Sequence, residues 1–299
     1  MNRNAKWITA FIVFAVVAAA GYFLLEPSSI EGETVYSQPK SLRYTFEIRN
    51  DSEQPYQGGS VWVYAPAEQT SFQKVKEIRV SGADYQLEKD ALGNQTLELK
   101  VGPMAPGGRK TVTVSTLLHM ASALQPVELQ DYTRYLKAEP FIEIDKPELA
   151  TFSLTFAGMP LDEKAAAIKT TVGNHITYAG YVRENLGALY ALREKRGDCT
   201  EYMSLSVAAL RLNDIPARAV AGFVVPGQSA VLSSDDYHNW TEFYNGTGWQ
   251  VLDAQNQKLA EQQDHYVVFR ILSGQTEENN ARFSERFVSS DSQLKIRLI

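Results

Sequence analysis

The chain contains a single cysteine, Cys199, and the residues around it indicate chemistry rather than packing. Polar Asp198, Thr200 and Glu201 stand beside it and an apolar run follows over residues 202–212. Asp followed three positions later by Glu is a capping pattern, so this run is predicted to be a buried helix with Cys199 in its first turn. There the positive end of the helix dipole favours thiolate over thiol, which makes Cys199 a candidate nucleophile.

A candidate base and its partner lie further along the chain. His238 falls in a predicted strand over residues 237–244, and Asp253 ends a second predicted strand over residues 249–253. The Asn-Gly dipeptide at 245–246 is a strong hairpin signal. A two-residue turn there would place His238 directly opposite Asp253, and a four-residue loop would leave the two residues diagonal on the same face. Either register permits contact between imidazole and carboxylate.

Cysteine, imidazole and carboxylate together form a nucleophilic triad. The imidazole of His238 takes the thiol proton, and the carboxylate fixes its tautomer and stabilises its charged form. The implied chemistry is acyl transfer. The other histidines, His119, His175 and His265, lack such a carboxylate and are predicted to be structural or exposed. Glu242, on the same strand face as His238, is predicted to be a surface or supporting residue.

Three motifs lie in the order and spacing that one enzyme family carries. They are Gly197-Asp198-Cys199 followed by Ile215-Pro216-Ala217-Arg218, then His238-Asn239-Trp240-Thr241-Glu242, then Gly248-Trp249-Gln250-Val251-Leu252-Asp253. Residues 165–255 thereby resemble the transglutaminase-like superfamily of papain-type folds, of the bacterial membrane-anchored type. Asn239 and Thr241 depart from the commoner alanine and valine, and Ala254 replaces a frequent proline. None of the three belongs to the triad.

The resemblance implies a thioester on Cys199 that is released to water or to an amine. It also implies a second oxyanion donor, for which Asn185, Tyr181 and Tyr190 are candidates. Arg218 matches the family turn and is predicted to form a structural ion pair or carbonyl contact. Relatives that cross-link proteins frame the thioester with a tryptophan tunnel, for which this chain has no spare tryptophan. Calcium serves some relatives, yet only adjacent acids at 235–236 are available here, so neither a cofactor nor a metal is expected.

The segments that must position these residues fall into two regions. Residues 42–48 alternate apolar and polar side chains, and strand-like runs recur over 61–64, 75–80, 96–101 and 111–118. A β-sandwich over residues 34–120, acting as a spacer or docking module, is the prediction. Residues 126–299 are of mixed class, with helical spacing over 129–136, a well-capped helix start at 162–169 and a terminal strand or docking segment at 294–299.

The N-terminus carries a candidate membrane anchor. Residues 7–25 are uncharged and, at about 1.5 Å per residue, nearly span a bilayer core of about 30 Å. Arg3 and Lys6 precede this run and acidic residues follow it, which places residues 1–6 in the cytosol and the rest in the periplasm or outside the cell. A signal peptide cleaved after the small residues Ala18 and Ala20 is the alternative.

Composition limits the remaining possibilities. A net charge of −6 and a pI near 5.4 disfavour a nucleic-acid partner, and one cysteine with four histidines cannot form a Cys-rich zinc site. The expected fold is α+β: a transmembrane helix, a β-sandwich, then a papain-like domain with a helix on an antiparallel sheet. The expected protein hydrolyses or transfers amide bonds of peptides, proteins or cell-wall peptides. A catalytically inactive binding scaffold, or an adhesion domain attaching through its thiol, are the alternatives.

Overall fold

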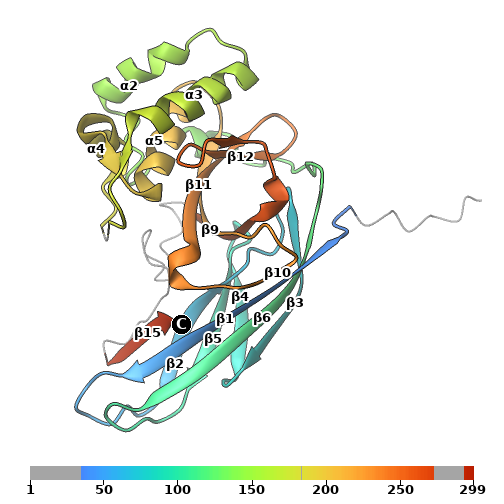
Figure 1. The fold of residues 1–299 in the computed structure, drawn as a ribbon, viewed down its shortest axis with the longest axis vertical. Helices are drawn as coiled ribbons and strands as arrows, with labels where there is room; N and C mark the ends of the chain where they lie inside the picture. The colour runs from blue at the N-terminus through green and yellow to red at the C-terminus, as the bar shows by residue number, and fades with distance from the viewer. Residues whose placement is uncertain (1–34, 183, 273–292) are drawn as a thin grey trace, which may run out of the picture. The chain divides into compact units, whose positions relative to one another are not determined.

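The structure is a computed structural model that describes residues 35–182, 184–272 and 293–299 (Figure 1). The predicted tail at residues 1–6 and the predicted anchor at 7–25 lie outside the described residues. Within the described part, no helix is both long enough and apolar enough to cross a membrane.

Two β-sheets form the N-terminal part of the described chain, here called the two-sheet region. The first has the order β10-β1-β6-β3, with β15 also paired to β1. The second has the order β2-β5-β4. The strands are β1 (Gln38–Asn50), β2 (Gly59–Ala65), β3 (Gln73–Ser81), β4 (Tyr85–Lys89), β5 (Gln95–Val101), β6 (Arg109–Met120), β10 (Ser229–Val231) and β15 (Leu294–Leu298).

The alternation seen in the sequence decides which face of β1 is buried. Leu42, Tyr44, Phe46 and Ile48 enter one apolar cluster with residues of β2, β5 and β6, so the two sheets share a core. Each strand-like run predicted between residues 42 and 118 lies within an observed strand. The strand β4 was not predicted, because every one of its residues is exposed and its sequence carries no burial pattern.

Two short strands from later in the chain complete the edge of β1. Strand β10 pairs in parallel with Ser41, Leu42 and Arg43, and β15 pairs antiparallel with residues 46–50. Both cover backbone groups that an edge strand would otherwise leave unpaired. The apolar C-terminal segment is therefore a strand, one of the two roles expected for it, and the sheet built by residues 38–120 takes up strands from beyond residue 126.

A five-stranded antiparallel sheet, order β13-β12-β11-β9-β14, and four α-helices form most of the remaining described residues (Figure 1). The strands are β9 (Ala217–Val224), β11 (Tyr237–Tyr244), β12 (Trp249–Asp253), β13 (Lys258–Leu259) and β14 (Tyr266–Leu272). The helices are α2 (Pro147–Ser153), α3 (Leu161–His175), α4 (Gly187–Glu194) and α5 (Cys199–Arg211). A parallel pair, β7 (Thr177–Tyr178) and β8 (Arg196–Gly197), precedes α5.

Helix α5 is the central element of this part, as its apolar sequence predicts. All its residues from Glu201 to Arg211 are buried. It packs with α3 and α4 and against one face of the sheet, where small Ala217, Ala219 and Ala221 admit the helix closely. Because the helix is enclosed on every side, its first turn is held rigidly.

The edge strand of this sheet, β14, meets the two-sheet region through side-chain amides. Gln73 donates its Nε2 to the carbonyl of Val268 at 2.9 Å and accepts the Val268 N–H at 2.8 Å. Asn94 makes the same two bonds with Ile271, at 3.0 and 2.7 Å. These amides form hydrogen bonds with backbone groups along the edge of β14 that would otherwise be buried and unpaired.

Two local predictions differ from the structure. The helical spacing over residues 129–136 produces only the short 3-10 helix η1 (Thr133–Leu136), because no apolar face is formed for a longer helix to bury. Helix α3 begins after Pro160 without a side-chain cap, so the predicted cap at its start is wrong. The remaining 3-10 helices are η2 (Leu154–Phe156), η3 (Ser234–Asp236) and η4 (Gln263–His265).

Candidate active site

The start of helix α5 has the capping box that its sequence predicts. The Asp198 carboxylate accepts the Thr200 N–H at 2.9 Å, and the Glu201 carboxylate accepts the Asp198 N–H at 2.9 Å. The second oxygens of these carboxylates hold the preceding loop, accepting the N–H groups of Val182 and Leu186 at 2.9 and 3.0 Å. The cap thus fixes both the helix start and the loop beside it.

Gly197 makes this arrangement possible. A Cβ atom at this position would lie 2.4 Å from Cβ of Glu201, so a larger residue would displace the capping carboxylate. Cys199 therefore occupies the first turn, half-buried and without a disulfide partner. Its backbone N–H belongs to the turn whose N–H groups have no partner within the helix.

His238 and Asp253 are in contact, but in the four-residue register. Thr241 pairs with Leu252 and Tyr244 with Trp249, which leaves residues 245–248 as the loop. The two-residue Asn-Gly turn is therefore wrong. The side chain of Asn245 accepts the N–H groups of Thr247 and Gly248 at 3.0 Å each, and this cap stabilises the longer loop.

The contact itself is short. Nε2 of His238 lies 2.7 Å from Oδ2 of Asp253. The Asp253 side chain is 1% exposed and the His238 side chain 12% exposed, so bulk water barely screens the pair. Because Nε2 is committed to the carboxylate, Nδ1 is the nitrogen that remains for the thiol of Cys199.

Two residues that the sequence analysis missed complete the surroundings of the Asp253 carboxylate. Asn256 donates its side-chain amide to Oδ2 at 2.8 Å and its backbone N–H to Oδ1 at 3.1 Å. The Tyr266 hydroxyl donates to Oδ2 at 3.0 Å. The Asn256 amide also lies 3.2 Å from Nε2 of His238. The position of Asn256 three residues after Asp253 was an available signal, whereas Tyr266 comes from another strand, β14.

The charges of the pair support each other. Burial by itself lowers the pKa of His238, but the hydrogen bonds to Asp253 and Cys199 outweigh it and raise this pKa to about 10. Burial likewise tends to raise the pKa of Asp253, yet the bonds from His238 and Asn256 hold it below its usual range. The imidazolium and carboxylate forms are both favoured at neutral pH. The Cys199 contact places the thiol beside the charged ring.

Arg218 and Glu242 form a structural ion pair, as expected for Arg218. Nη2 of Arg218 lies 2.6 Å from Oε2 of Glu242, and its guanidinium lies 4.1 Å above the Trp249 ring. Both side chains are buried, so Glu242 is a supporting residue rather than a surface one.

The other histidines lie outside this contact network. In the two-sheet region, Nδ1 of His119 is 3.1 Å from the Tyr36 carbonyl. His175 is the last residue of α3, and its Nε2 is 2.8 Å from the Leu192 carbonyl of α4. His265 ends the 3-10 helix η4. All three have local structural positions.

The candidate oxyanion donors lie at and after the loop that the cap holds. The Asn185 side chain has both polar atoms buried without a partner among the described residues. Tyr181 is exposed and Tyr190 lies in α4. The three candidates remain predictions.

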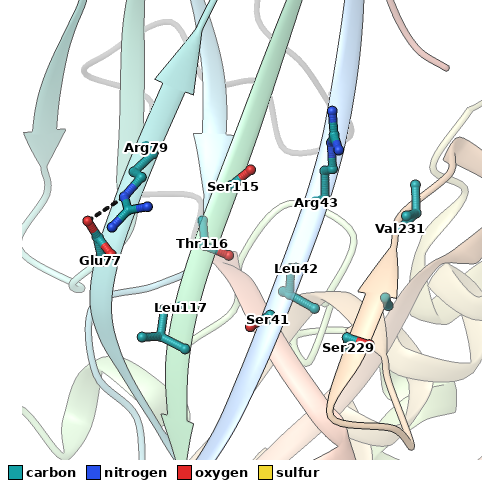
Figure 2. Close-up of a pocket in the computed structure, with 11 residues that line it drawn as sticks. Ser41, Leu42, Arg43, Glu77, Arg79, Ser115, Thr116, Leu117, Ser229 and Val231 are labelled. Carbon is teal, nitrogen blue, oxygen red and sulfur yellow. Dashed lines mark hydrogen bonds and ion pairs between the residues drawn. The ribbon is translucent and has the colours of Figure 1, made fainter.

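Among the described residues, no group of three or more potential metal ligands is present, and Asp236 of the adjacent acids accepts a hydrogen bond from the Ser233 hydroxyl. A groove of about 610 Å³ lies across β1, β3, β6 and β10 (Figure 2). Arg43 and Arg79 flank Ser115 in it, and Arg79 is paired with Glu77 at 2.6 Å.

Known proteins resemble this chain in the region that contains Cys199, His238 and Asp253. Residues 150–254 match the model of the transglutaminase-like superfamily. No curated protein matches the chain. Among solved structures, it is similar to a candidate cysteine protease from Cytophaga hutchinsonii, with 15% identity, a TM-score of 0.57 and 86% of each chain covered. It is also similar to the periplasmic domain of TgpA from Pseudomonas aeruginosa, with 18% identity, a TM-score of 0.38, and 72% of this chain and 88% of that chain covered.

The first of these likenesses shows a shared fold. The superfamily match begins within α2 and ends just after Asp253, so it contains all three predicted triad residues. The mixed α+β architecture and the resemblance to the transglutaminase-like superfamily are therefore confirmed. The chain carries a domain of the transglutaminase-like superfamily over residues 150–254.

Proposed function

We propose that this protein is an acyl-transfer enzyme that hydrolyses amide bonds of peptides or proteins, with Cys199 as nucleophile, His238 as base and Asp253 as orienting carboxylate. One observation supports this assignment above the others. The 2.7 Å contact between Nε2 of His238 and Asp253 turns Nδ1 toward the half-buried thiol at the start of α5.

The geometry supports a two-step reaction. In the first step Sγ of Cys199 attacks the amide carbonyl, the C–N bond breaks, and the imidazolium of His238 gives its proton to the leaving amine. The product is a thioester on Cys199. In the second step neutral His238 takes a proton from water, which attacks the thioester and releases the carboxylic acid, and the thiolate returns.

The first turn of α5 contributes to both steps. The tetrahedral intermediates carry negative charge on the former carbonyl oxygen. The N–H of Cys199, which has no acceptor within the helix, and the positive end of the helix dipole favour that charge. Meanwhile the carboxylate of Asp253 holds the imidazole orientation while the proton moves.

Water is the acceptor that we propose. Transfer to an amine requires apolar side chains that exclude water at about 55 M from the thioester. Of the tryptophans in the described part, Trp62 lies in β2, whereas Trp240 and Trp249 are packed inside the sheet at 1% and 3% exposed. None of these is free to frame an amine tunnel. Hydrolysis is therefore favoured over cross-linking.

The location and substrate follow from the sequence expectations. The uncharged run at residues 7–25 supports attachment to the cytoplasmic membrane, with the enzyme on the periplasmic or extracellular side. Peptides, proteins or cell-wall peptides are the substrates proposed for that side.

A catalytically inactive scaffold is the second candidate, because a fold can persist without its activity. It would be favoured if the thiol proved unreactive. The imidazole–carboxylate pair, the two further donors to its carboxylate and the capped helix of the candidate nucleophile are all present. Together they support an enzymatic function.

The test incubates the purified full-length protein with a glutamine-containing peptide and an excess of labelled primary amine. Released ammonia, new peptide termini and amine incorporation are followed together, with Cys199→Ala as the matched control. Hydrolysis that depends on Cys199 and exceeds incorporation is expected. Predominant incorporation would replace hydrolysis by transfer, and the absence of any Cys199-dependent reaction would favour the scaffold.

A further inference from the structure

Two side-chain hydrogen bonds fasten the strand of the candidate base to the helix of the candidate nucleophile. Nδ2 of Asn239 donates to Oγ1 of Thr200 at 2.9 Å. Two residues further along β11, Oγ1 of Thr241 donates to the carbonyl of Met203 at 3.1 Å. Both bonds therefore run from β11 to the first turns of α5.

Asn239 and Thr241 each contact α5 through a polar side chain. An alanine at 239 would bury no polar atoms. By contrast Oδ1 of Asn239 is buried without a partner among the described residues, so the asparagine carries a desolvation cost that packing does not explain.

The bond between Asn239 and Thr200 joins the immediate neighbours of the two reacting residues. Thr200 follows Cys199 on the helix, and Asn239 follows His238 on the strand. The cap carboxylates at the same helix start bind the loop at Val182 and Leu186 instead of β11. The cap thus holds the helix to the loop, and Asn239 holds it to the strand of the base.

We propose that Asn239 is a positioning residue whose hydrogen bond to Thr200 sets the separation between the thiol of Cys199 and the imidazole of His238. This inference rests on the proposed function of that pair. With the bond in place, the imidazolium stays close enough to stabilise the thiolate. Without it, β11 and the first turn of α5 can move apart, and the imidazole is no longer held beside the thiol.

The test measures the rate at which iodoacetamide alkylates Cys199 between pH 5 and pH 9. Thr200→Val removes the hydroxyl at constant volume, Thr200→Ser keeps it, and Asn239→Ala removes the amide. At pH 6 we expect Thr200→Val and Asn239→Ala each to slow alkylation about fivefold, the effect of losing one hydrogen bond. The double variant should be no slower than either single one, and Thr200→Ser should retain the original rate.

The pH profile separates positioning from simple destabilisation. At pH 9 the variants should approach the original rate, since thiolate then forms without help from the imidazolium. Thr113→Val, which removes a hydroxyl 3.0 Å from that of Thr45 in the two-sheet region, is the matched control and should leave the profile unchanged. Thermal unfolding of every variant is recorded in parallel.

The outcomes distinguish this inference from the proposed function. Unchanged alkylation at pH 6 in Thr200→Val, or additive losses in the double variant, would overturn the positioning role even if turnover still requires Cys199. If Cys199→Ala leaves turnover intact, the proposed function itself fails. If Asn239→Ala does not fold, the isosteric Thr200→Val and its Thr200→Ser counterpart still decide the question.

Discussion

Nε2 of His238 lies 2.7 Å from Oδ2 of Asp253, although the two residues are not directly opposite each other across β11 and β12. The four-residue loop shifts the pairing, and the diagonal on one face of the hairpin still brings imidazole and carboxylate into contact. The carboxylate then receives two further donors, from Asn256 and Tyr266. Five predictions depend on this pair and on the packing around it.

Asp253→Asn should leave the fold intact but lower turnover by up to about 10⁴-fold, the loss known for the equivalent change in a serine protease triad. The amide can donate to Nε2, which favours the wrong tautomer and no longer stabilises the imidazolium. Steady-state kinetics and circular dichroism check this. Turnover within a factor of two of the original would contradict an orienting role.

The stabilisation contributed by His238 should decline at alkaline pH. Its pKa in the folded state, about 10, lies above the ordinary value of 6.5, so folding favours the protonated form. Its contribution is therefore complete below pH 6.5 and is lost as the pH rises through 10. Urea unfolding of the original protein and of His238→Gln should differ most at pH 6 and least above pH 10.

His119→Gln, a change in the two-sheet region, serves as the control for that experiment.

Asp253 stabilises the fold in the opposite pH direction. Its pKa is held below 3.8, so its contribution to the free energy of unfolding is present above that pH and is lost as the pH falls further. A His238 contribution that grew between pH 6 and pH 10 would contradict the assigned direction.

Tyr266→Phe should reduce kcat about fivefold with little change in KM, because one hydrogen bond to the carboxylate is lost while its other donors remain. Burial raises the pKa of Tyr266, so its hydroxyl remains a donor at neutral pH. Tyr244→Phe, which removes a hydroxyl bonded to the Val127 carbonyl, is the matched control. Equal effects of the two changes would argue against a role for Tyr266 in the site.

Asn256→Asp should reduce kcat more than Asn256→Ala does. The new carboxylate would face Oδ2 of Asp253 where the amide now donates at 2.8 Å, and like charges in a buried site repel. The comparison of kcat for the two variants at pH 7 checks this order. The reverse order would mean that the Asn256 side chain is not oriented toward the carboxylate in solution.

Arg218→Met should lower the free energy of unfolding by about 3–5 kcal/mol, because it leaves the buried Glu242 carboxylate without its partner. The double change Arg218→Met with Glu242→Leu should recover most of this loss, since no buried charge remains. Urea unfolding measures both. Arg43→Met in the exposed groove is the control, and a similar loss there would show that the effect does not depend on burial.

The sequence determined much of the local structure. Alternation in residues 42–48 predicted the buried face of β1, and the apolar run after Cys199 predicted a buried helix, because both signals arise from the local period of the backbone. The capping box of Asp198 and Glu201 was readable for the same reason: its partners are three residues apart. Two strand segments and a tight connection were enough to bring His238 and Asp253 to one face.

Contacts between residues far apart in the chain depend on how the elements pack. The register of the β11–β12 hairpin was set by the side chain of Asn245 and by pairing on both sides, so the local Asn-Gly signal predicted the wrong loop length. Tyr266 reaches Asp253 from β14, and Asn239 reaches Thr200 across the interface of sheet and helix. No local pattern in the sequence predicts either contact, because the packing of other elements determines which polar side chains meet. The sequence thus identified the three candidate triad residues, whereas the packing of sheet and helix sets the neighbours that hold them in place.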